Sequence, residues 1–339
     1  MKKTALFLTL IIICLMLTGC YGDSYKGELI LEYPEDTLPK LITASDTHWF
    51  YMLSEYGSSD YTLTVGSSYD SLKRVHSFTD ARVWHMDAEG DCVVWSEDRD
   101  GQTVYNLYSE KSSQVKTIFT ADKTADHQLA NMGISDGIAY YAYTDYENEA
   151  CGIYGYDIEA GESYTVYNIE YTPDPCIMAL GFDDNYISVA SGNKVFTVDV
   201  NSSDTVFSYT LGDDISYVYG LSYDAENDVM GIYYHDSEAE QIGIIDKGEL
   251  ISVFTLNENH YAYNENIVCR DGHLYWVTIA NVSGNIRDHY TYIDYDYISH
   301  KPTEVNATFG FVFKDGETYL LRMGETQKEM KLYKDSKDS

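Results

Sequence analysis

The stretch Arg82-Val-Trp-His-Met-Asp-Ala-Glu-Gly-Asp-Cys-Val-Val-Trp95 decides the fold of this chain. Two apolar, aromatic runs flank a short polar turn at Gly90, which is the pattern of a β-hairpin. The pattern recurs along the chain, with its turns at Asp46, Gly90, Asp136, Asp184, Asn227, Asp271 and Asp315. The steps between these turns are 44, 46, 48, 43, 44 and 44 residues. A repeat of this length with strand-like content predicts a β-propeller with one blade per repeat.

The second repeat shows the expected blade in full. Its four apolar runs predict strands at Arg82–Met86, Cys92–Trp95, Val104–Tyr108 and Val115–Phe119. The charged segment Glu97–Gly101 is predicted to be the loop that joins the second strand to the third. Other repeats keep the same rhythm, so the sequence predicts an all-β chain of four-stranded blades.

The last repeat is one strand short. It supplies apolar runs at Thr308–Phe313, Tyr319–Met323 and Glu329–Tyr333 only. A matching run, Glu28–Tyr33, lies at the other end of the repeats, so we expect the N-terminal strand to complete the last blade and leave no open sheet edge. Seven blades in one domain over residues 28–335 is the favoured count, and six or eight are the alternatives.

One segment carries a family resemblance. Val93-Val-Trp-Ser-Glu-Asp-Arg-Asp-Gly-Gln-Thr-Val-Tyr-Asn-Leu-Tyr108 resembles the WD40-like repeat of TolB-type propellers, in which a Ser-x-Asp-Arg-x-Gly-like loop joins an apolar strand to an aromatic one. Only this repeat matches closely. The resemblance supports the propeller fold and implies no particular activity.

The first residues look like an export signal. Lys2 and Lys3 precede 13 apolar or hydroxylic residues, Ala5–Leu17, which are too few to span a bilayer. The segment ends in Leu17-Thr18-Gly19-Cys20, which resembles the lipobox of bacterial lipoproteins. The resemblance implies a signal peptide at residues 1–19, a lipid on Cys20 and a tether over residues 20–27. An ordinary secretory signal with a chance cysteine is the alternative.

The charge of the chain limits its partners. The sequence has 55 Asp and Glu residues against 22 Lys and Arg residues. A field of that sign repels nucleic acid and anionic membrane surfaces, so we expect no nucleic-acid partner. The expected location is the extracytoplasmic face of the cell membrane, where the lipid provides the membrane contact.

Two cysteines are candidates for a disulfide. Cys151 is predicted at the loop between the second and third strands of the third repeat, and Cys176 opens the next repeat. Both should lie on one face of the ring, where a bridge requires Cα atoms within about 7 Å of each other. The alternative is two unpaired thiols.

The sequence has no complete catalytic or metal-binding motif. Gly133-Ile-Ser-Asp-Gly137 matches the Gly-x-Ser-x-Gly spacing, and Ser113-Gln-Val-Lys116 and Ser191-Gly-Asn-Lys194 match Ser-x-x-Lys, but each falls at a predicted turn or strand end of the repeat and not between a strand and a helix. The histidines do not follow metal-ligand spacing. The sequence therefore names no catalytic residue, metal ligand or cofactor. Calcium is the one ion left open, because Asp98-x-Asp100-Gly101 is a fragment of an alternating acidic loop and several such loops should share one face.

Aromatic residues near the starts of the innermost strands could ring the mouth of a central channel. They are Trp84, Tyr217, Tyr219, Tyr261 and Tyr263. Packing between blades is the competing interpretation of these rings. The first functional hypothesis is a lipid-anchored, non-enzymatic module that binds an unknown protein or glycan. The alternatives are an extracytoplasmic hydrolase or lyase acting on glycan, and a structural member of an envelope complex.

Overall fold

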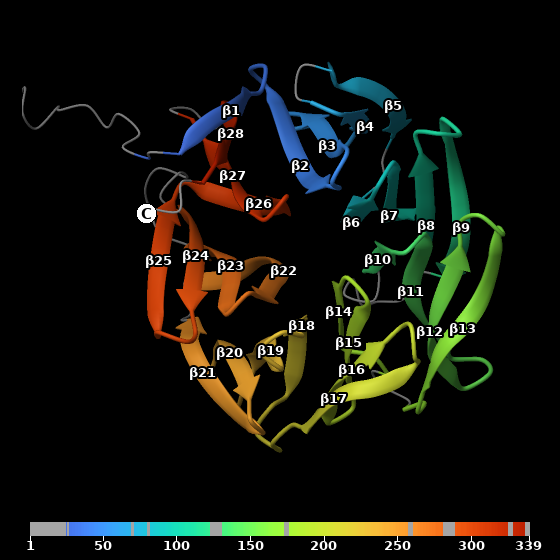
Figure 1. The fold of residues 1–339 in the computed structure, drawn as a ribbon, viewed down its shortest axis with the longest axis vertical. Coiled ribbons are helices and arrows are strands. Elements are labelled where there is room, and N and C mark those ends of the chain that lie inside the picture. The colour runs from blue at the N-terminus through green and yellow to red at the C-terminus, as the bar shows by residue number, and fades with distance from the viewer. Residues whose placement is uncertain are drawn as a thin grey trace, which may run out of the picture.

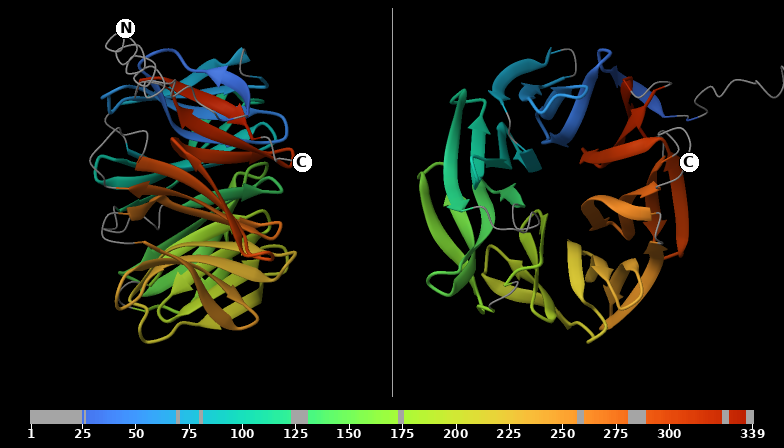
Figure 2. Two further views of the ribbon diagram at one scale, coloured as in Figure 1. Left: turned by 90° about the vertical axis from the view of Figure 1, so that its left-hand side faces the viewer. Right: turned by 180° about the vertical axis from the view of Figure 1, so that it is seen from behind.

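Seven four-stranded antiparallel sheets stand around a central axis (Figure 1). The computed structural model describes residues 25, 27–68, 71–79, 82–122, 131–172, 176–256, 260–280, 289–324 and 328–335. Seen from the side and from behind, the sheets remain separate blades of one ring (Figure 2). The predicted all-β propeller with seven blades is confirmed.

Each blade has an inner strand, two middle strands and an outer strand. The inner strands are β2 (Thr37–Ala44), β6 (Arg82–Glu89), β10 (Met132–Ser135), β14 (Ala179–Asp183), β18 (Tyr217–Asp224), β22 (His260–Arg270) and β26 (Thr308–Lys314). The second strands are β3 (Trp49–Glu55), β7 (Cys92–Arg99), β11 (Ile138–Asp145), β15 (Tyr186–Ser191), β19 (Val229–His235), β23 (His273–Ala280) and β27 (Glu317–Met323).

The third and outer strands follow in the same order around the ring. The third strands are β4 (Tyr61–Gly66), β8 (Gln102–Ser109), β12 (Ala150–Asp157), β16 (Lys194–Asp199), β20 (Glu240–Asp246), β24 (Tyr290–Asp296) and β28 (Met330–Lys334). The outer strands are β5 (Lys73–Phe78), β9 (Gln114–Asp122), β13 (Glu162–Ile169), β17 (Asp204–Thr210), β21 (Glu249–Leu256), β25 (Lys301–Asn306) and, in the last blade, β1 (Glu28–Glu32).

Asp-Gly pairs make several of the tight turns between inner and second strands. Asp136-Gly137, Asp271-Gly272 and Asp315-Gly316 each separate directly paired strand residues, and all six φ angles are positive. Two positive φ angles define the type I′ turn, whose twist matches that of the strands it joins. The turn residues that mark the repeat in the sequence therefore set the blade geometry.

The hydrophobic core lies between the blades. In the described part of the chain, each buried apolar cluster combines residues of two neighbouring blades. Trp95 of blade 2, for example, packs with Phe78 of blade 1 at a ring-centroid distance of 5.7 Å. Because every junction has its own apolar cluster, opening any one of them exposes apolar surface on two blades.

The N-terminal strand closes the ring. β1 pairs antiparallel with β28, with Leu31 opposite Leu332 and Glu32 opposite Lys331. The pairing continues at Tyr33, a buried ring whose backbone N–H donates to the Met330 carbonyl over 2.9 Å. The predicted completion of the last blade by this strand is confirmed. The predicted signal peptide 1–19, Cys20 and most of the tether 20–27 lie outside the described residues.

The predicted loop at Glu97–Gly101 is wrong. Strand β7 continues through Arg99, and only Asp100-Gly101 forms the turn. Glu97 is fully buried; its carboxylate forms an ion pair with Arg99 Nη2 over 2.7 Å and accepts a hydrogen bond from Trp95 Nε1 over 3.3 Å. A buried charge is tolerated when it is paired and hydrogen-bonded, so a charged residue here does not end the strand.

Candidate functional site

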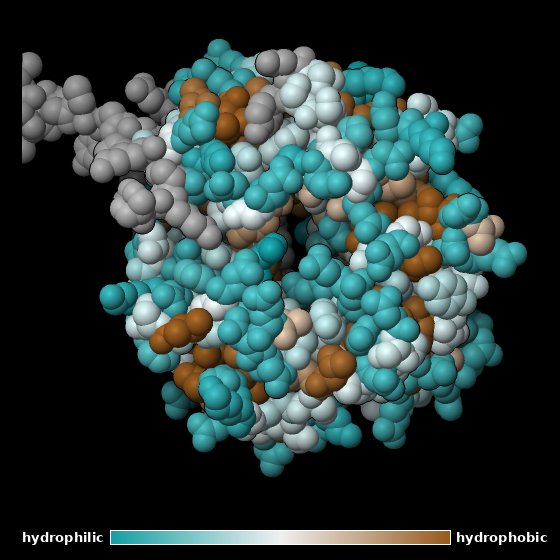
Figure 3. All heavy atoms as spheres, in the orientation of Figure 1, coloured by the Kyte–Doolittle hydropathy of each residue, from teal (hydrophilic) through white to brown (hydrophobic). Residues whose placement is uncertain are grey.

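A cavity of about 530 Å³ lies where the seven inner strands converge. Residues of β2, β6, β10, β14, β18, β22 and β26 all line it. The space-filling view shows an opening at the centre of the ring that is bordered largely by hydrophilic residues (Figure 3). We call this the axial cavity. Its volume is within the range of small-molecule sites.

The described lining of the axial cavity is strongly acidic. Its carboxylates are Asp87, Glu89, Asp183, Asp184, Asp224, Glu226 and Asp271. The lining includes one arginine, Arg270, and one histidine, His85. Most of these acids come from the last residues of the inner strands or from the turns that follow. A concave site of one charge sign concentrates ions of the opposite sign.

A close approach of two inner strands places Asp183. A Cβ on Gly181 would lie 2.0 Å from the Leu221 carbonyl oxygen, so only glycine fits between β14 and β18 here. The two oxygens of Asp183 then accept hydrogen bonds from Ser222 Oγ and from the Tyr223 backbone N–H, each at 2.9 Å. Burial nevertheless raises the pKa of the Asp183 carboxyl to about 7.

Two further titratable groups on β6 are shaped by burial. Asp87 accepts the Ile134 N–H of the next blade over 2.9 Å, but burial raises the pKa of its carboxyl to about 6. His85 lines the same wall, and burial lowers the pKa of its imidazole to about 4. The wall therefore holds a neutral histidine at neutral pH, with acids that change charge in the range of pH 6 to 7.

Several lining carboxylates fasten one blade to the next. Glu89 of blade 2 accepts the backbone N–H groups of Asp136 and Gly137 over 2.7 and 2.9 Å. Asp224 of blade 5 accepts the Gly272 N–H over 2.9 Å and the Tyr297 hydroxyl over 2.7 Å. With Asp183, these acids each have their oxygens occupied by the neighbouring blade or by their own turn. We call Glu89, Asp183 and Asp224 the latch carboxylates.

The other four junctions between blades are spanned by different side-chain contacts, which also lie near the ends of the inner strands. Thr47 Oγ1 donates to the Gly90 carbonyl over 2.8 Å, and Ser135 Oγ donates to Asn185 Oδ1 over 2.8 Å. The Arg270 guanidinium lies 5.0 Å from the centre of the Phe313 ring. Lys314 Nζ completes the circle by donating to the Asp46 carbonyl over 2.8 Å. A side chain near the end of an inner strand thus spans each junction of the ring.

Three lining acids are available to a ligand. Asp184, Glu226 and Asp271 lie on the turns after inner strands and are exposed to solvent. Asp271 Oδ2 lies 3.1 Å from Arg270 Nε, a surface pair of small energetic value. We call these three the rim carboxylates. Aromatic side chains lie beside them in the same lining, including Tyr186 and Tyr223, whose ring centroids are 5.6 Å apart.

Three of the aromatic residues predicted to bind ligand lie outside the axial cavity. The Arg82 guanidinium carbon stands 3.7 Å from the centre of the Trp84 ring. Tyr219 packs against Tyr217 and Tyr233, at centroid distances of 5.0 and 4.6 Å. Trp84, Tyr217 and Tyr219 are not among the described residues of the axial cavity. The side chains of Tyr261 and Tyr263 lie outside the described part of the structure.

The register explains this separation. Val83, next to Trp84, pairs with Glu97 near the end of the second strand, whereas Glu89 pairs with Cys92 beside the first turn. Trp84 therefore lies toward one opening of the ring, and the latch and rim carboxylates lie toward the other. Tyr217 and Tyr219 also contribute to clusters between blades, as the packing interpretation expects.

Groups for catalysis and metal binding are sparse. Among the described residues, no set of three or more His, Cys, Asp or Glu side chains is arranged to hold a metal ion. Of the hydroxyls that line the cavity, Ser222 donates to Asp183 and accepts the Cys269 N–H over 2.7 Å. This pairing to a carboxylate and a backbone group differs from the serine–histidine arrangement of a nucleophilic site.

The described residues also contain no helix long and apolar enough to cross a membrane.

The cavity acids had a signal in the sequence. Met86-Asp-Ala-Glu-Gly90 and Tyr223-Asp-Ala-Glu-Asn227 are near copies, and Phe182-Asp-Asp-Asn185 is a shorter form. An acid in these runs ends an inner strand in each case. Acids are common in turns, so the sequence alone does not distinguish a shared lining from seven separate turns.

Comparisons with solved structures support the fold. A chain in the crystal structure of the mitotic checkpoint complex aligns with a TM-score of 0.58 and 13% identity, covering 92% of this chain and 96% of that one. An acylaminoacyl peptidase from Pyrococcus horikoshii aligns with a TM-score of 0.54 and 12% identity, covering 88% of this chain and 52% of that one. This chain therefore spans about half the length of that peptidase.

A third comparison bears on ring closure. The β-propeller domain of the trilobed protease from Pyrococcus furiosus aligns with a TM-score of 0.57 and 10% identity, covering 89% of this chain and 94% of that one. That domain is described as having an open velcro topology, whereas β1 pairs with β28 here. No protein-family model and no curated protein matches the sequence. At these identities the likenesses show the fold alone: the chain is similar to seven-bladed WD40-type and peptidase-type propellers.

Proposed function

We propose that the chain is a lipid-anchored, extracytoplasmic β-propeller that binds a cationic ligand at the axial cavity and catalyses no reaction. The observation that carries the proposal is the cavity itself, which joins a ligand-sized volume to seven carboxylates and a single arginine. The latch carboxylates are occupied by the fold. The rim carboxylates are exposed and supply the charge that a ligand would meet.

The lining favours a particular class of cation. Tyr186 and Tyr223 lie beside the acids, and Phe311 and Phe313 line the opposite part of the cavity. Carboxylates bind an amine or guanidinium by charge, while aromatic faces bind both the cation and its methylene chain. A polyamine, or a lysine or arginine side chain of a protein partner, has this combination. The excess of acid over the whole chain would speed its approach.

The proposed anchor rests on the resemblance of Leu17-Thr18-Gly19-Cys20 to a lipobox, and the position of the first strand indicates which blade it would hold. Tyr25 packs edge-on against Tyr333 at 5.4 Å, and its hydroxyl bonds to Asp335, so the chain is fixed to blade 7 from this residue onward. Tyr25 is five residue steps after Cys20, which span at most about 18 Å when the chain is extended. A lipid on Cys20 would therefore hold blade 7 close to the membrane, although the acidic surface is repelled by anionic lipid.

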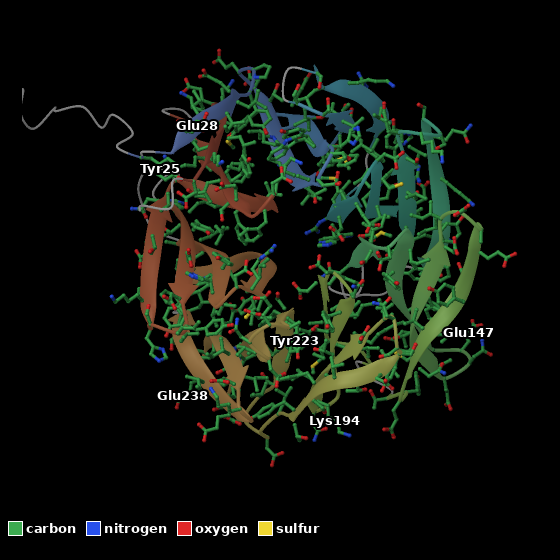
Figure 4. All side chains as sticks on the ribbon, in the orientation of Figure 1. Tyr25, Glu28, Glu147, Lys194, Tyr223 and Glu238 are labelled. Carbon is green, nitrogen blue, oxygen red and sulfur yellow. The ribbon has the colours of Figure 1, made fainter. Side chains whose placement is uncertain are left out.

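The decisive experiment is calorimetric titration of the full chain in detergent with spermine. The test variant is Asp184→Asn, Glu226→Gln and Asp271→Asn combined. The matched control, Glu147→Gln, Asp204→Asn and Glu238→Gln, removes the same charge from exposed positions away from the cavity lining. Glu147 and Glu238 lie at the outside of the ring, whereas Tyr223 lies on its inner side (Figure 4).

We expect the rim variant to weaken spermine binding at least about tenfold, while the control stays within about twofold of the wild type. Binding should also weaken as salt is raised, because it depends on exposed charges. Equal losses in both variants would show that only net charge matters, and would contradict a site at the cavity. Loss on Trp84→Ala with Tyr219→Ala, but not in the rim variant, would place the site at the other opening.

A further inference from the structure

Two buried thiols meet at the junction of blades 3 and 4. Cys151 is the second residue of β12, and Cys176 lies just before β14. Cys151 is 4% exposed, Cys176 is 0% exposed, and both belong to the apolar cluster that joins the two blades. Cys176 Sγ donates to the Glu170 carbonyl over 3.8 Å, and Glu170 follows Ile169, which pairs with Cys151. The structure carries the pair as free thiols.

Each thiol is fixed to its own blade. Cys151 pairs with Thr144 on β11 and with Ile169 on β13, and Thr144 Oγ1 lies 3.4 Å from its sulfur. The Cys176 carbonyl accepts a hydrogen bond from Ser191 at the end of β15. The two cysteines are held by two different blades and lie in the same apolar cluster, so a bond between their sulfurs would cross the junction.

We propose that Cys151 and Cys176 form a disulfide that joins blade 3 covalently to blade 4. Forming the S–S bond removes one proton from each thiol and two electrons from the pair. A disulfide-bearing donor takes up those electrons: one cysteine thiolate attacks it to give a mixed disulfide, and the second displaces the donor, which leaves as a dithiol. The inference depends on the proposed function only for the extracytoplasmic location, where such donors act.

The bond should form while the chain folds. In the folded, reduced ring both sulfurs are shielded from a protein donor, and burial raises the pKa of the Cys151 thiol to about 12. Because the thiolate is the attacking species, the folded pair reacts slowly. Before the third and fourth blades pack, the same thiols are accessible and titrate normally. Burial would then protect the finished bond from reductants.

The position of this bond fits the rest of the ring. The side-chain hydrogen bonds described across this junction near the axis are neutral: Ser135 to Asn185, and Asn131 Nδ2 to the Leu180 carbonyl over 3.1 Å. The junctions before and after it are spanned by the carboxyl groups of Glu89 and Asp183. A covalent link would therefore reinforce a junction that has no latch carboxylate.

The experiment is refolding of the denatured, reduced full chain in a glutathione redox buffer, followed by denaturation and alkylation of free thiols. Trypsin leaves both cysteines on one peptide, because no lysine or arginine lies between Lys123 and Lys194. Glu-specific cleavage separates them, since Glu159, Glu162 and Glu170 lie between. We expect Cys92 and Cys269 to be alkylated, and the fragments that carry Cys151 and Cys176 to remain joined until reduction.

Full alkylation of Cys151 and Cys176 as well as Cys92 and Cys269, or joining of either partner to Cys92 or Cys269, would overturn the proposal. Adding the same buffer to chain that was first folded in reductant tests whether the bond forms during folding. We expect oxidation of the folded chain to be at least about tenfold slower than oxidation during refolding. Equal rates would overturn the proposal that the bond forms during folding. Cys151→Ala should leave Cys176 alkylated. The matched variant Cys269→Ala, at another buried cysteine, should keep the link; if Cys151→Ala does not fold, the wild-type fragments decide.

Chain isolated from membranes of an expressing bacterium separates this inference from the proposed function. A joined pair in both preparations supports the disulfide and the oxidising location. A joined pair after refolding but alkylated thiols in the isolated chain would support the bond geometry and contradict the location. Joined fragments with no loss of spermine binding in the rim variant would leave the disulfide standing and refute the cavity site.

Discussion

Asp183→Asn should change how the stability of the ring depends on pH. In the folded chain, burial raises the pKa of the Asp183 carboxyl to about 7, and the neighbouring Asp184 adds to this. The pKa of Asp183 is lowered, by less than burial raises it, by hydrogen bonds from the Tyr223 N–H and Ser222 and by the charge of Arg270. The ordinary pKa of an aspartate carboxyl is 3.8. The ionised form of Asp183 is therefore less favourable in the folded ring than in the unfolded chain.

The sign and size of the effect follow from proton linkage. Between about pH 4 and pH 7 the folded chain binds this proton more tightly than the unfolded chain does, so its stability falls as the pH rises. A shift of about three pH units corresponds to about 4 kcal/mol of unfolding free energy. Water in the cavity screens the charge, so we expect about 2–4 kcal/mol. The penalty is complete above pH 7 and absent below pH 4.

The assay is urea denaturation of the wild type and of Asp183→Asn at several values between pH 4.5 and 8. Asparagine has the shape of aspartate, and its oxygen can still accept the Tyr223 N–H. The measured quantity is the difference in unfolding free energy between the two proteins, because other groups cancel in it. His85, whose pKa is lowered by burial to about 4, would otherwise make stability rise with pH as far as its unfolded value of 6.5.

We expect the unfolding free energy of the variant, relative to that of the wild type, to increase as the pH rises and to level off above pH 7. Asp204→Asn, at an exposed carboxylate on the outer strand β17, is the control and should give a flat difference. A difference for Asp183→Asn that stays constant within about 0.5 kcal/mol over the whole range would refute the burial argument. A difference that changes with the opposite sign would mean that the hydrogen bonds to the ionised form dominate.

Three further predictions concern closure, the latches and the anchor. Removing residues 27–33 deletes β1 and should lower the melting temperature by at least about 5 °C; an unchanged melting curve would show that β28 does not need its partner. Glu89→Ala should cost about 2 kcal/mol in urea denaturation, because it leaves the Asp136 and Gly137 N–H groups without their carboxylate; the exposed acid Glu226, replaced in the same way, should cost less than about 0.5 kcal/mol. Cys20→Ala should move the chain from the membrane to the soluble fraction, and mass spectrometry should find the acylated N-terminal peptide only in the wild type; equal membrane retention of both would contradict the anchor.

The architecture could be predicted because local and global signals agree. An Asp-Gly pair such as Asp271-Gly272 forms its turn through its own backbone preferences, whatever surrounds it. The period of these turns therefore counts blades directly. Closure by β1 was also predictable, because a blade with three strands leaves an edge that some other segment must cover.

The axial cavity could not be predicted in the same way. Whether a side chain on an inner strand points into the cavity or toward a neighbouring blade depends on how closely the blades approach. Contacts such as that of Gly181 with Leu221 set this approach, and the sequence does not reveal them. Trp84 and Tyr219 are large and lie at strand starts; in the structure they contact Arg82 and Tyr233, and ligand binding by these rings stays a prediction.

Glu97 illustrates the same limit at a single residue. A Glu-Asp-Arg-Asp run favours a loop when each charge is considered alone. In the blade, Glu97 instead pairs with Arg99 and accepts from Trp95, and it remains inside the strand. Burial raises the pKa of its carboxyl, and the Arg99 charge offsets part of that cost. Charge compensation between residues two apart on one face of a strand is invisible to a count of polar residues.

The acids of the axial cavity therefore form two sets, one that joins neighbouring blades and one that is exposed to a ligand. This difference makes the proposed site testable. The latch carboxylates give up their oxygens to backbone N–H groups across the junctions, so replacing them weakens the ring and reports little about a ligand. The rim carboxylates bind nothing that the fold requires, so replacing them leaves the ring intact. If the cavity binds a cation, replacing a rim carboxylate such as Asp184 will lower the affinity, whereas replacing a latch carboxylate such as Asp183 will change the stability of the ring. A cavity that merely closes the fold would show no such separation, because only the latch positions would then have any measurable effect.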